Sequence, residues 1–298
     1  MKKENQGLAF RRKRSALLRR ICAVTLTCLL LMSSMIFGAS AAAVFPKDAT
    51  PTTVYLDGRE VLRDECVIME SITYVPLRNF CNLFENCKIT WNANTSTATV
   101  KTNDLTMTVQ SGAIYITANG HYYYTVGKVR NLNGHLYVPI RPLAKAFAAE
   151  LHWNASARRT ELKSAANGRN AVSWANYNAD EVYWLSRIIS AEAKGEPLLG
   201  QIAVGNVVLN RVKSPAYPNT IYGVIFDRKH GTQFSPVSFG TIYNTPSASS
   251  IVAAKICLEG YSLSGEVLFF INPRIATNNW IVKNRPYAFT IGNHDFYR

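Results

Sequence analysis

The hydrophobic pattern of the last 120 residues is helical. In residues 180–195, DEVYWLSRIISAEAKG, the apolar side chains of Val182, Leu185 and Ile189 recur at intervals of three and four, which places them on one face of a helix. An Asn and an Asp at its start can cap this helix, and the Gly and Pro that follow can end it. Residues 198–214 have a similar periodicity and predict a second helix that packs back on the first.

Shorter apolar segments continue this helical domain. Residues 215–226 predict a Pro-bounded loop that leads into an apolar strand or a short helix. Residues 245–260 predict a helix with Thr245 as its cap and Pro246 at its first position. Residues 266–273, EVLFFINP, predict a buried strand that ends at Asn-Pro. We therefore expect a mostly helical domain with a short β-element.

The segment between residues 51 and 163 has a strand-rich pattern that repeats, because residues 72–100 match residues 135–163. Each copy predicts a strand that ends at Val-Pro, an amphipathic helix of two to three turns, and a strand–turn–strand that contains Trp-Asn. Another strand–turn–strand, VYLDGREV, precedes the first copy. The identical residues pair as Tyr74 with Tyr137, Val75 with Val138, Pro76 with Pro139, Arg78 with Arg141, Phe84 with Phe147, and Trp91-Asn92 with Trp153-Asn154.

The domain boundaries follow from these patterns. Residues 165–178 are small, polar and without periodicity, which indicates a linker. We expect a repeat-containing α+β domain at residues 51–164 and the mostly helical domain at residues 179–298. A length of 298 residues agrees with about two domains and a tail. The fold class expected for the whole chain is α+β.

The first 41 residues have the three parts of a secretory signal. Residues 1–20 hold eight Lys and Arg against one acid, an apolar run follows, and ASAAA supplies a small-residue cleavage site. We expect cleavage after Ala41. The alternative is an uncleaved anchor, because the segment from Ile21 to Ala43 is long enough to span a bilayer. In both cases the rest of the chain is expected outside the cytoplasm.

Removal of this segment changes the charge. The full chain has a formal net charge of +14, and the loss of eight basic residues and one acidic residue leaves +7. A moderately basic exported protein suits an anionic polymer such as a bacterial wall. No Arg-rich recognition helix or aromatic RNA-binding motif is present, so no nucleic-acid partner is expected. None of the four remaining cysteines belongs to a CxxC pair, and we expect no disulfide and no metal or other cofactor.

One carboxylate interrupts the apolar face of the first predicted helix. Glu192 lies three residues after Ile189 and four after Ile188, so it projects from the buried face one turn before the helix ends. Burial between two apolar helices disfavours the charged form and raises the pKa of a carboxyl. A protonated carboxyl of this kind is the general acid of glycoside cleavage. The alternatives are a buried Glu that is paired with an Arg such as Arg211, and a helix end that turns toward solvent.

Five motifs of this domain occur together in one known family. SRIISAEAKGEPLLGQIAVGNVVLNRV, YPNTIYGVIF, QFSPV, FFINP and IGNHDFY follow the order seen in SleB/CwlJ-type cell wall hydrolases, which include the spore cortex-lytic enzymes. The resemblance spans Asp180 to Tyr297. It implies a lysozyme-like domain that cleaves the glycan strands of peptidoglycan as a lytic transglycosylase, in spore cortex lysis during germination or in wall remodelling.

The resemblance also implies roles for individual residues. The catalytic glutamate of the family corresponds to Glu192, whereas Glu196 of the same motif is expected to be structural. The substrate-binding residues that we expect are Gln233, Phe234, Ser235, His294 and Tyr287. The chain departs from the family at Phe239, where many members have Asp, and in an N-terminal domain that is not the peptidoglycan-binding repeat of many spore members.

The repeat domain resembles the stalk domain that is also named the copper amine oxidase N-terminal domain, on its YVPLR and Trp-Asn signatures. The resemblance implies no copper site, because His121, His135 and His152 lack metal-ligand spacing. Two interpretations stay open, a wall-facing spacer or adhesion module and a scaffold without a ligand of its own. We expect a monomer in the cell wall or spore envelope, whose partner is peptidoglycan of the cortex or of the vegetative wall. Membrane contact is expected only through the signal or anchor segment.

The residues also limit the mechanism. Two-carboxylate hydrolysis needs a second Asp or Glu across the sugar, and none of the domain's other acids stands in a motif that projects toward Glu192. A lytic transglycosylase needs one carboxyl, because the 6-hydroxyl of muramic acid attacks the anomeric carbon. We therefore expect Glu192→Gln to abolish lysis with little change in thermal melting.

Three alternatives remain. The first is a zinc-dependent N-acetylmuramoyl-L-alanine amidase, for which only His230 and His294 are available in this domain. The second is a Cys257–His294 peptidase, although Cys257 lies in an apolar pattern typical of a packed side chain. The third is a non-catalytic wall-binding or spore structural protein.

Overall fold

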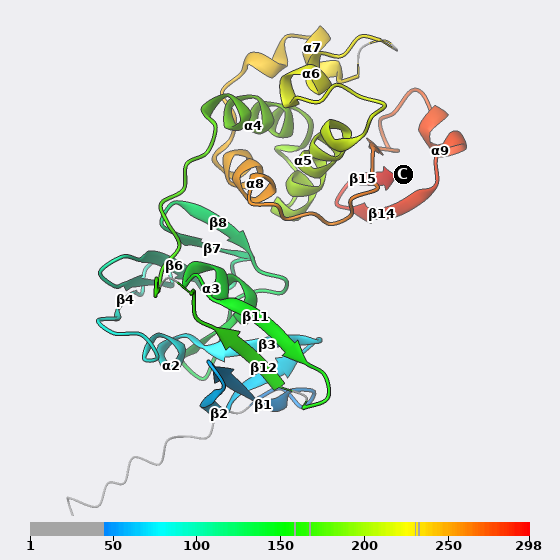
Figure 1. Ribbon diagram of the computed structural model, residues 1–298. Coiled ribbons are helices and arrows are strands. Elements are labelled where there is room, and N and C mark those ends of the chain that lie inside the picture. The colour runs from blue at the N-terminus through cyan, green and yellow to red at the C-terminus, as the bar shows by residue number, and fades with distance from the viewer. Residues whose placement is uncertain (1–44, 158, 167, 230, 232) are drawn as a thin grey trace, which may run out of the picture. The chain divides into compact units, whose positions relative to one another are not determined.

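The computed structural model describes residues 45–298 except 158, 167, 230 and 232. Strands predominate up to residue 163 and helices after residue 178 (Figure 1), so the fold class is α+β, as predicted. Residues 46–298 form one compact unit that contains two hydrophobic cores. The expected signal segment lies outside the described residues. Among the residues that are described, no helix is both long and apolar enough to cross a bilayer.

The N-terminal part contains two sheets. The larger one consists of seven strands, which are β1 (Thr50–Leu56), β2 (Arg59–Met69), β3 (Ile72–Pro76), β9 (Arg130–Leu132), β10 (His135–Pro139), β11 (Glu150–Asn154) and β12 (Arg159–Lys163). Their order is β11-β12-β1-β2-β3-β10-β9, and all neighbours are antiparallel except β1 and β12. Asp57 and Gly58 connect β1 to β2 with φ values of 51° and 78°, as expected for a two-residue Asp-Gly hairpin turn.

The smaller sheet is an antiparallel meander. Its five strands, in this order, are β4 (Lys88–Asn92), β5 (Thr97–Lys101), β6 (Thr106–Gln110), β7 (Tyr115–Ala118) and β8 (His121–Tyr124). Two short helices, α2 (Leu77–Cys81) and α3 (Ile140–Ala146), follow the Val-Pro strands of the two repeats. Helix α3 contacts strands of both sheets (Figure 1).

Helix α2 is shorter than the two to three turns that the pattern predicted. After Cys81 the chain tightens into three-residue turns, in which the Phe84 amide donates to the Cys81 carbonyl at 3.1 Å. This tightening brings Phe84 onto Phe147, with ring centroids 4.1 Å apart. Packing between the two repeats therefore ends the helix before its apolar pattern does.

The two copies of the repeat are related by an approximate two-fold axis. Val75 of β3 pairs in register with its own counterpart Val138 of β10. Phe84 likewise stacks on its own counterpart Phe147. Contacts between equivalent residues are what a two-fold axis produces. All four side chains are buried in one core.

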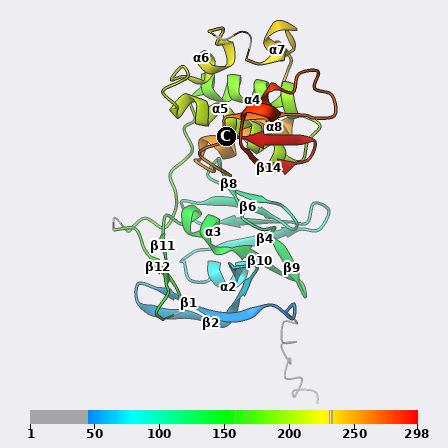
Figure 2. The same ribbon diagram turned by 90° about the vertical axis from the view of Figure 1, so that its right-hand side faces the viewer.

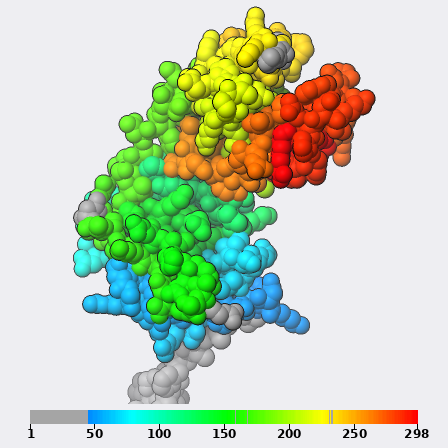
Figure 3. All heavy atoms as spheres, turned by 45° about the vertical axis from the view of Figure 1, so that its right-hand side comes forward, coloured from blue at the N-terminus to red at the C-terminus, as the bar shows by residue number. Residues whose placement is uncertain are grey.

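The C-terminal part is mostly helical. Its helices are α4 (Ala179–Ala193), α5 (Leu198–Lys213), α6 (Ile221–Phe226), α7 (Ser235–Ser238), the 3-10 helix η1 (Thr241–Tyr243), α8 (Ala248–Leu258) and α9 (Trp280–Asn284). Helices α4, α5 and α8 contact one another around the second core (Figures 1 and 2). A small antiparallel sheet of order β13-β15-β14 is formed by β13 (Phe269–Ile271), β14 (Tyr287–Ile291) and β15 (His294–Tyr297). Residues 272–293 are mostly exposed, and Figure 3 shows this segment in orange and red at the surface.

Two elements of the structure differ in detail from those predicted from the sequence. Helix α8 begins at Ala248 with Ser247 as its cap, not with Thr245 as the cap and Pro246 as the first helical residue. The Ser247 hydroxyl accepts a hydrogen bond from the Ser250 amide at 3.1 Å. The predicted buried strand is the three-residue β13, whose side chains are only partly buried because it lies at the edge of its sheet.

Candidate active site

Helix α4 carries Glu192 in its last turn. The Asn178 side chain caps its start, with Oδ1 accepting from the amides of Asp180 at 2.9 Å and Glu181 at 3.3 Å. The side chains of Leu185, Ile188 and Ile189 along the same helix are fully buried. Because residues three and four apart share a helix face, Glu192 continues this buried face and is itself partly buried.

The environment of Glu192 favours its protonated form. Burial raises the pKa of Glu192 to about 7, while the positive charge of Arg211 opposes this rise. The Glu192 carboxyl has no hydrogen bond with any described residue, although it is close enough to sense Arg211. At neutral pH the group can therefore both donate and accept a proton, which is what a general acid and base must do.

Arg211 is a buried cation on α5. Its Nε donates to the Leu268 carbonyl at 2.8 Å, and its guanidinium lies 5.1 Å from the ring centroid of Phe234. Burial lowers the pKa of Arg211. Among the described residues there is no ion pair between Glu192 and Arg211, so Glu192 is not the salt-bridged structural glutamate that the sequence left open.

Buried polar side chains of α5 hold the chain that leads into β13. Asn206 Nδ2 donates to the Tyr261 carbonyl at 2.8 Å, and Asn210 Nδ2 donates to the Val267 carbonyl at 2.9 Å. Both amides are buried, and their interval of four residues places them on one face of the helix. The NVVLNR motif thus fixes the segment whose carbonyl anchors the Arg211 guanidinium.

A second buried network holds the turn that follows Glu192. Gln201 Nε2 donates to the Glu196 carbonyl at 2.9 Å, and its Oε1 accepts from the Ser250 hydroxyl at 2.9 Å. Ser190 Oγ accepts from the Ser247 amide at 3.1 Å. These bonds tie the end of α4 to α5 and α8, so the Glu192 backbone is held by two neighbouring helices.

The predicted substrate residues Gln233, Phe234 and Ser235 lie at the start of α7, which contacts α4. Gln233 Oε1 is 3.5 Å from the Arg211 guanidinium, and Phe234 is buried in the core beneath it. Ser235 is exposed at the first position of α7. The structure therefore brings Gln233 and Phe234 to the same arginine that acts on Glu192.

His294 belongs to a neighbouring cluster around Glu196. Both Glu196 oxygens accept hydrogen bonds from Asn293, from its amide and its Nδ2, each at 2.9 Å. Desolvation opposes ionisation of Glu196, but these bonds outweigh it and the pKa lies below the ordinary value. His294 Nδ1 is 3.9 Å from Glu196 Oε1, and burial lowers the pKa of His294. Glu196 thus clamps the β14–β15 turn to the start of α5.

The fifth predicted substrate residue, Tyr287, lies apart from these groups. It is exposed on β14, where its hydroxyl is 2.8 Å from Thr290 Oγ1 and its ring packs on Tyr297. Within the described part of the chain, no hydrogen bond or ring contact joins Tyr287 to Glu192 or Arg211. Its assignment to the substrate stays a prediction.

None of the other described carboxylates in the domain acts on Glu192. Only Arg211 contributes a charge interaction to its pKa. Asp180 and Glu181 lie in the first turn of α4, at the opposite end of the helix. The other acids contact other residues: Glu196 contacts Asn293, Asp227 the Lys229 amide, Glu259 Tyr177, Glu266 Arg298, and Asp295 Thr290. The described residues therefore supply one candidate acid at this site.

Two contributors to the site were not assigned from the sequence. Asn293 secures Glu196 across 97 positions of chain, and no local pattern signals such a contact. Arg211 was considered only as a salt-bridge partner, although its buried position on α5 makes it a fixed charge near Glu192. Within the described residues, no group of three or more His, Cys, Asp or Glu could hold a metal ion.

The helical domain and the raised pKa of Glu192 point to a class of protein, the cell wall hydrolases, and the chain belongs to that family. Residues 195–297 match the family described as Cell Wall Hydrolase. Residues 55–162 match the family described as Copper amine oxidase N-terminal domain. Both resemblances predicted from the sequence are thereby confirmed. The first match begins at residue 195, three residues after Glu192.

The similar proteins include enzymes of spore-forming bacteria. The chain is 38% identical over 120 residues to a spore cortex-lytic enzyme of Bacillus cereus, which covers 40% of this chain and 45% of that enzyme. It is 30% identical over 111 residues to the cell wall hydrolase CwlJ of Oceanobacillus iheyensis, covering 35% of this chain and 77% of the relative. The chain therefore spans less than half of the cortex-lytic enzyme, but most of the shorter relative.

Solved structures are also similar to the same part of the chain. One of them is the catalytic domain of the germination-specific lytic transglycosylase SleB from Bacillus anthracis, at 37% identity and a TM-score of 0.38. The match covers 41% of this chain and 98% of that domain.

Proposed function

We propose that this protein degrades peptidoglycan as a lytic transglycosylase and that Glu192 is its catalytic acid and base. The observation that carries the proposal is the state of Glu192, a partly buried carboxyl with a pKa of about 7 and no hydrogen-bond partner among the described residues. Membership of the cell wall hydrolase family supports the choice of substrate. A single carboxyl suits this reaction better than two-carboxylate hydrolysis.

The proposed reaction uses the Glu192 carboxyl twice, first as an acid and then as a base. Protonated Glu192 donates to the glycosidic oxygen while the bond from that oxygen to the anomeric carbon breaks. The 6-hydroxyl of muramic acid then attacks the anomeric carbon, and the Glu192 carboxylate takes its proton. The product ends in a 1,6-anhydro ring, no water is consumed, and the enzyme returns to its starting state. The charge of Arg211 stabilises the carboxylate that exists between the two transfers.

We further propose that the chain consists of a stalk domain (residues 51–164), a linker (residues 165–178) and a catalytic domain (residues 179–298). The protein acts outside the cytoplasm, because its substrate is the wall and residues 1–41 have the pattern of a secretory signal. Similarity to spore cortex-lytic enzymes favours a role in germination, with remodelling of the vegetative wall as the alternative.

The test is mass spectrometry of the soluble fragments that the purified chain releases from peptidoglycan. Cortex that contains muramic lactam and vegetative sacculi should be digested side by side. We expect muropeptides with anhydro ends, and the preferred wall then identifies the biological substrate.

The controls distinguish the alternatives. Glu192→Gln should release nothing, whereas Glu181→Gln, which removes an exposed carboxylate of the same helix, should retain activity. Reducing ends in the products would mean that a second acid activates water, and free stem peptides would identify an amidase or peptidase. A wild-type chain that binds the wall without releasing fragments would be a structural protein.

A further inference from the structure

Some residues that recur in both copies of the repeat are buried in the stalk domain, whereas others lie on its surface. Tyr74 and Tyr137 are buried with the core of the domain. By contrast, Trp91 and Trp153 are 50% and 46% exposed. An exposed indole contributes little to folding, so its presence at two equivalent positions needs another reason.

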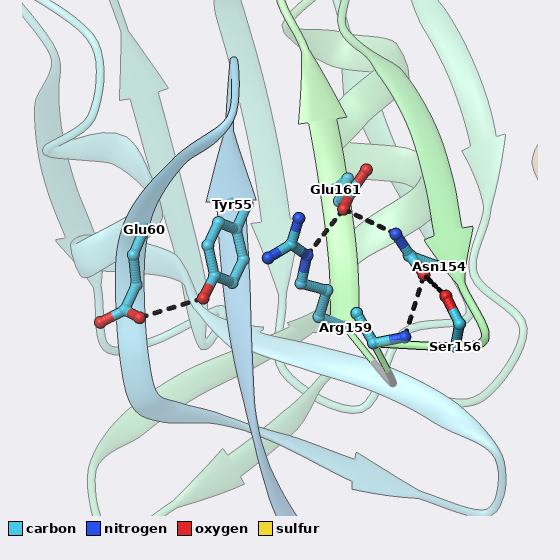
Figure 4. Close-up of polar contacts among 7 residues, drawn as sticks. Tyr55, Glu60, Asn154, Ser156, Arg159 and Glu161 are labelled. Carbon is cyan, nitrogen blue, oxygen red and sulfur yellow. Dashed lines mark hydrogen bonds and ion pairs between the residues drawn. The ribbon is translucent and has the colours of Figure 1, made fainter.

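The Asn that follows each Trp has a structural role, because its side chain orders the turn. Asn154 Oδ1 accepts a hydrogen bond from the Ser156 hydroxyl (Figure 4), at 2.8 Å. It accepts another from the Ala157 amide at 3.0 Å. Asn92 closes the equivalent turn. Its Oδ1 accepts hydrogen bonds from the amides of Asn94 at 3.0 Å and Thr95 at 3.3 Å. Each Asn therefore orders its turn, and each Trp is left on the surface beside it.

Each Trp lines a groove together with an equivalent Arg. One groove, of 320 Å³, is lined by Arg141 and Trp153 of the second copy and by residues 71–73 of the first. The other, of 170 Å³, is lined by Arg78 and Trp91 of the first copy and by residues 134–136 of the second. Residues 71–73 and 134–136 are equivalent in the repeat alignment. The two grooves are thus copies of one arrangement, exchanged by the two-fold axis.

Both grooves carry positive charge that no described residue neutralises. Arg78 and Arg141 are exposed, and neither guanidinium has a hydrogen bond or ion pair with any described residue. Arg159, which is also drawn in Figure 4, differs because its Nε donates to Glu161 at 2.7 Å. Among the described residues that line the two grooves there is no carboxylate, and each groove adds one histidine, His152 or His135.

We propose that the two grooves bind a glycan strand that carries carboxylates, which in this protein is the peptidoglycan that the catalytic domain cuts. The indole face packs on the C–H groups of a sugar ring, which are slightly positive. The free guanidinium of Arg78 or Arg141 binds a carboxylate with two parallel hydrogen bonds. Two equivalent sites suit a polymer that repeats one unit, because the second binding event is then intramolecular.

This inference rests on the proposed function for the identity of the polymer and goes beyond it by assigning a binding site outside the catalytic domain. Of the two interpretations that the sequence left open for the stalk domain, it selects the adhesion module. The site holds the enzyme on its substrate between cleavage events.

The test is co-sedimentation of the full chain with purified sacculi. Glu192→Gln serves as the parent, so that the wall is not digested and the result does not depend on cleavage. Adding Trp91→Ala and Trp153→Ala together should weaken binding about tenfold or more, and each change alone should weaken it less. Trp174→Ala is the matched control, because this indole is 69% exposed in the linker and lies in neither groove. Thermal melting should be the same in all variants.

Chemically treated sacculi identify the ligand. Binding should survive removal of teichoic acids by hydrofluoric acid and should fall when the wall carboxylates are amidated. Arg78→Gln with Arg141→Gln should weaken binding and make it less sensitive to salt. The proposal is overturned if the double Trp variant binds like its parent, if amidated sacculi bind equally well, or if stripping of teichoic acids abolishes binding. Loss of a dimer in the double Trp variant would instead identify a self-association surface and would also overturn it.

Discussion

Replacement of Glu192 by Gln should stabilise the fold at alkaline pH while it removes activity. The pKa of Glu192 is about 7 in the folded chain, against about 4.3 for an ordinary glutamate in the unfolded chain. A carboxyl whose pKa rises on folding does not change the free energy of unfolding below its unfolded pKa. As pH rises from there toward the folded pKa, the carboxyl lowers the free energy of unfolding progressively. Each pKa unit corresponds to about 1.4 kcal/mol, so the full cost well above pH 7 is about 4 kcal/mol.

Partial exposure reduces this figure. Because solvent screens the Glu192 carboxyl, we expect the neutral Gln variant to gain about 1 to 3 kcal/mol of unfolding free energy at pH 8. At pH 5 the wild-type group is mostly protonated and the gain should fall below about 1 kcal/mol. The sequence pattern led us to expect little change in melting for this variant, and the raised pKa replaces that expectation at alkaline pH.

The assay is urea unfolding of the wild-type chain and the variant from pH 5 to pH 8. Glu181→Gln should show no gain that grows with pH, because Glu181 is exposed on the same helix. If Glu192→Gln were no more stable relative to wild type at pH 8 than at pH 5, Glu192 would be well solvated. A solvated carboxyl could not hold a proton at neutral pH, and its role as the acid would be refuted.

Two further predictions follow from the same contacts. The kcat/KM for release of muropeptides should fall as pH rises above about 7, because only protonated Glu192 donates to the leaving oxygen. A kcat/KM that does not change from pH 5 to pH 9 would contradict this role. Gly292→Ala should destabilise the fold by about 2 to 4 kcal/mol, through a positive φ and lost hydrogen bonds to a charged group. A Cβ there would meet Glu196 Oε2 at 1.9 Å, whereas Gly112→Ala, also at positive φ but in open space, should cost about 1 kcal/mol in thermal unfolding.

Most elements of the fold could be predicted because their signals are local. The spacing of Leu185 and Ile189 and the cap at Asn178 are contained within α4 itself. The start of α8 was misplaced because Thr245 and Ser247 both have capping side chains, and the choice between them depends on packing. Ser247 caps the helix where its amide also donates to Ser190 of α4.

The candidate site was only partly predictable, because its contacts depend on packing and not only on local signals. Glu192 breaks an apolar stripe, so its position in the sequence already marks it. His294 was assigned from a motif, but only the folded chain places it beside Glu196 rather than in contact with Glu192. The assignments of Ser235 and Tyr287 to the substrate remain predictions.

The sequence by itself determined the elements, the duplication in the stalk domain, the family of the helical domain and the position of its single unusual carboxyl. Only the tertiary structure decided the pKa of Glu192 and the pairing of each repeat's Arg and Trp with a strand of the other copy. The physical reason is the range of the interactions. Periodicity and caps act over a few residues, whereas desolvation and groove formation depend on segments that are distant in the chain and meet only after folding.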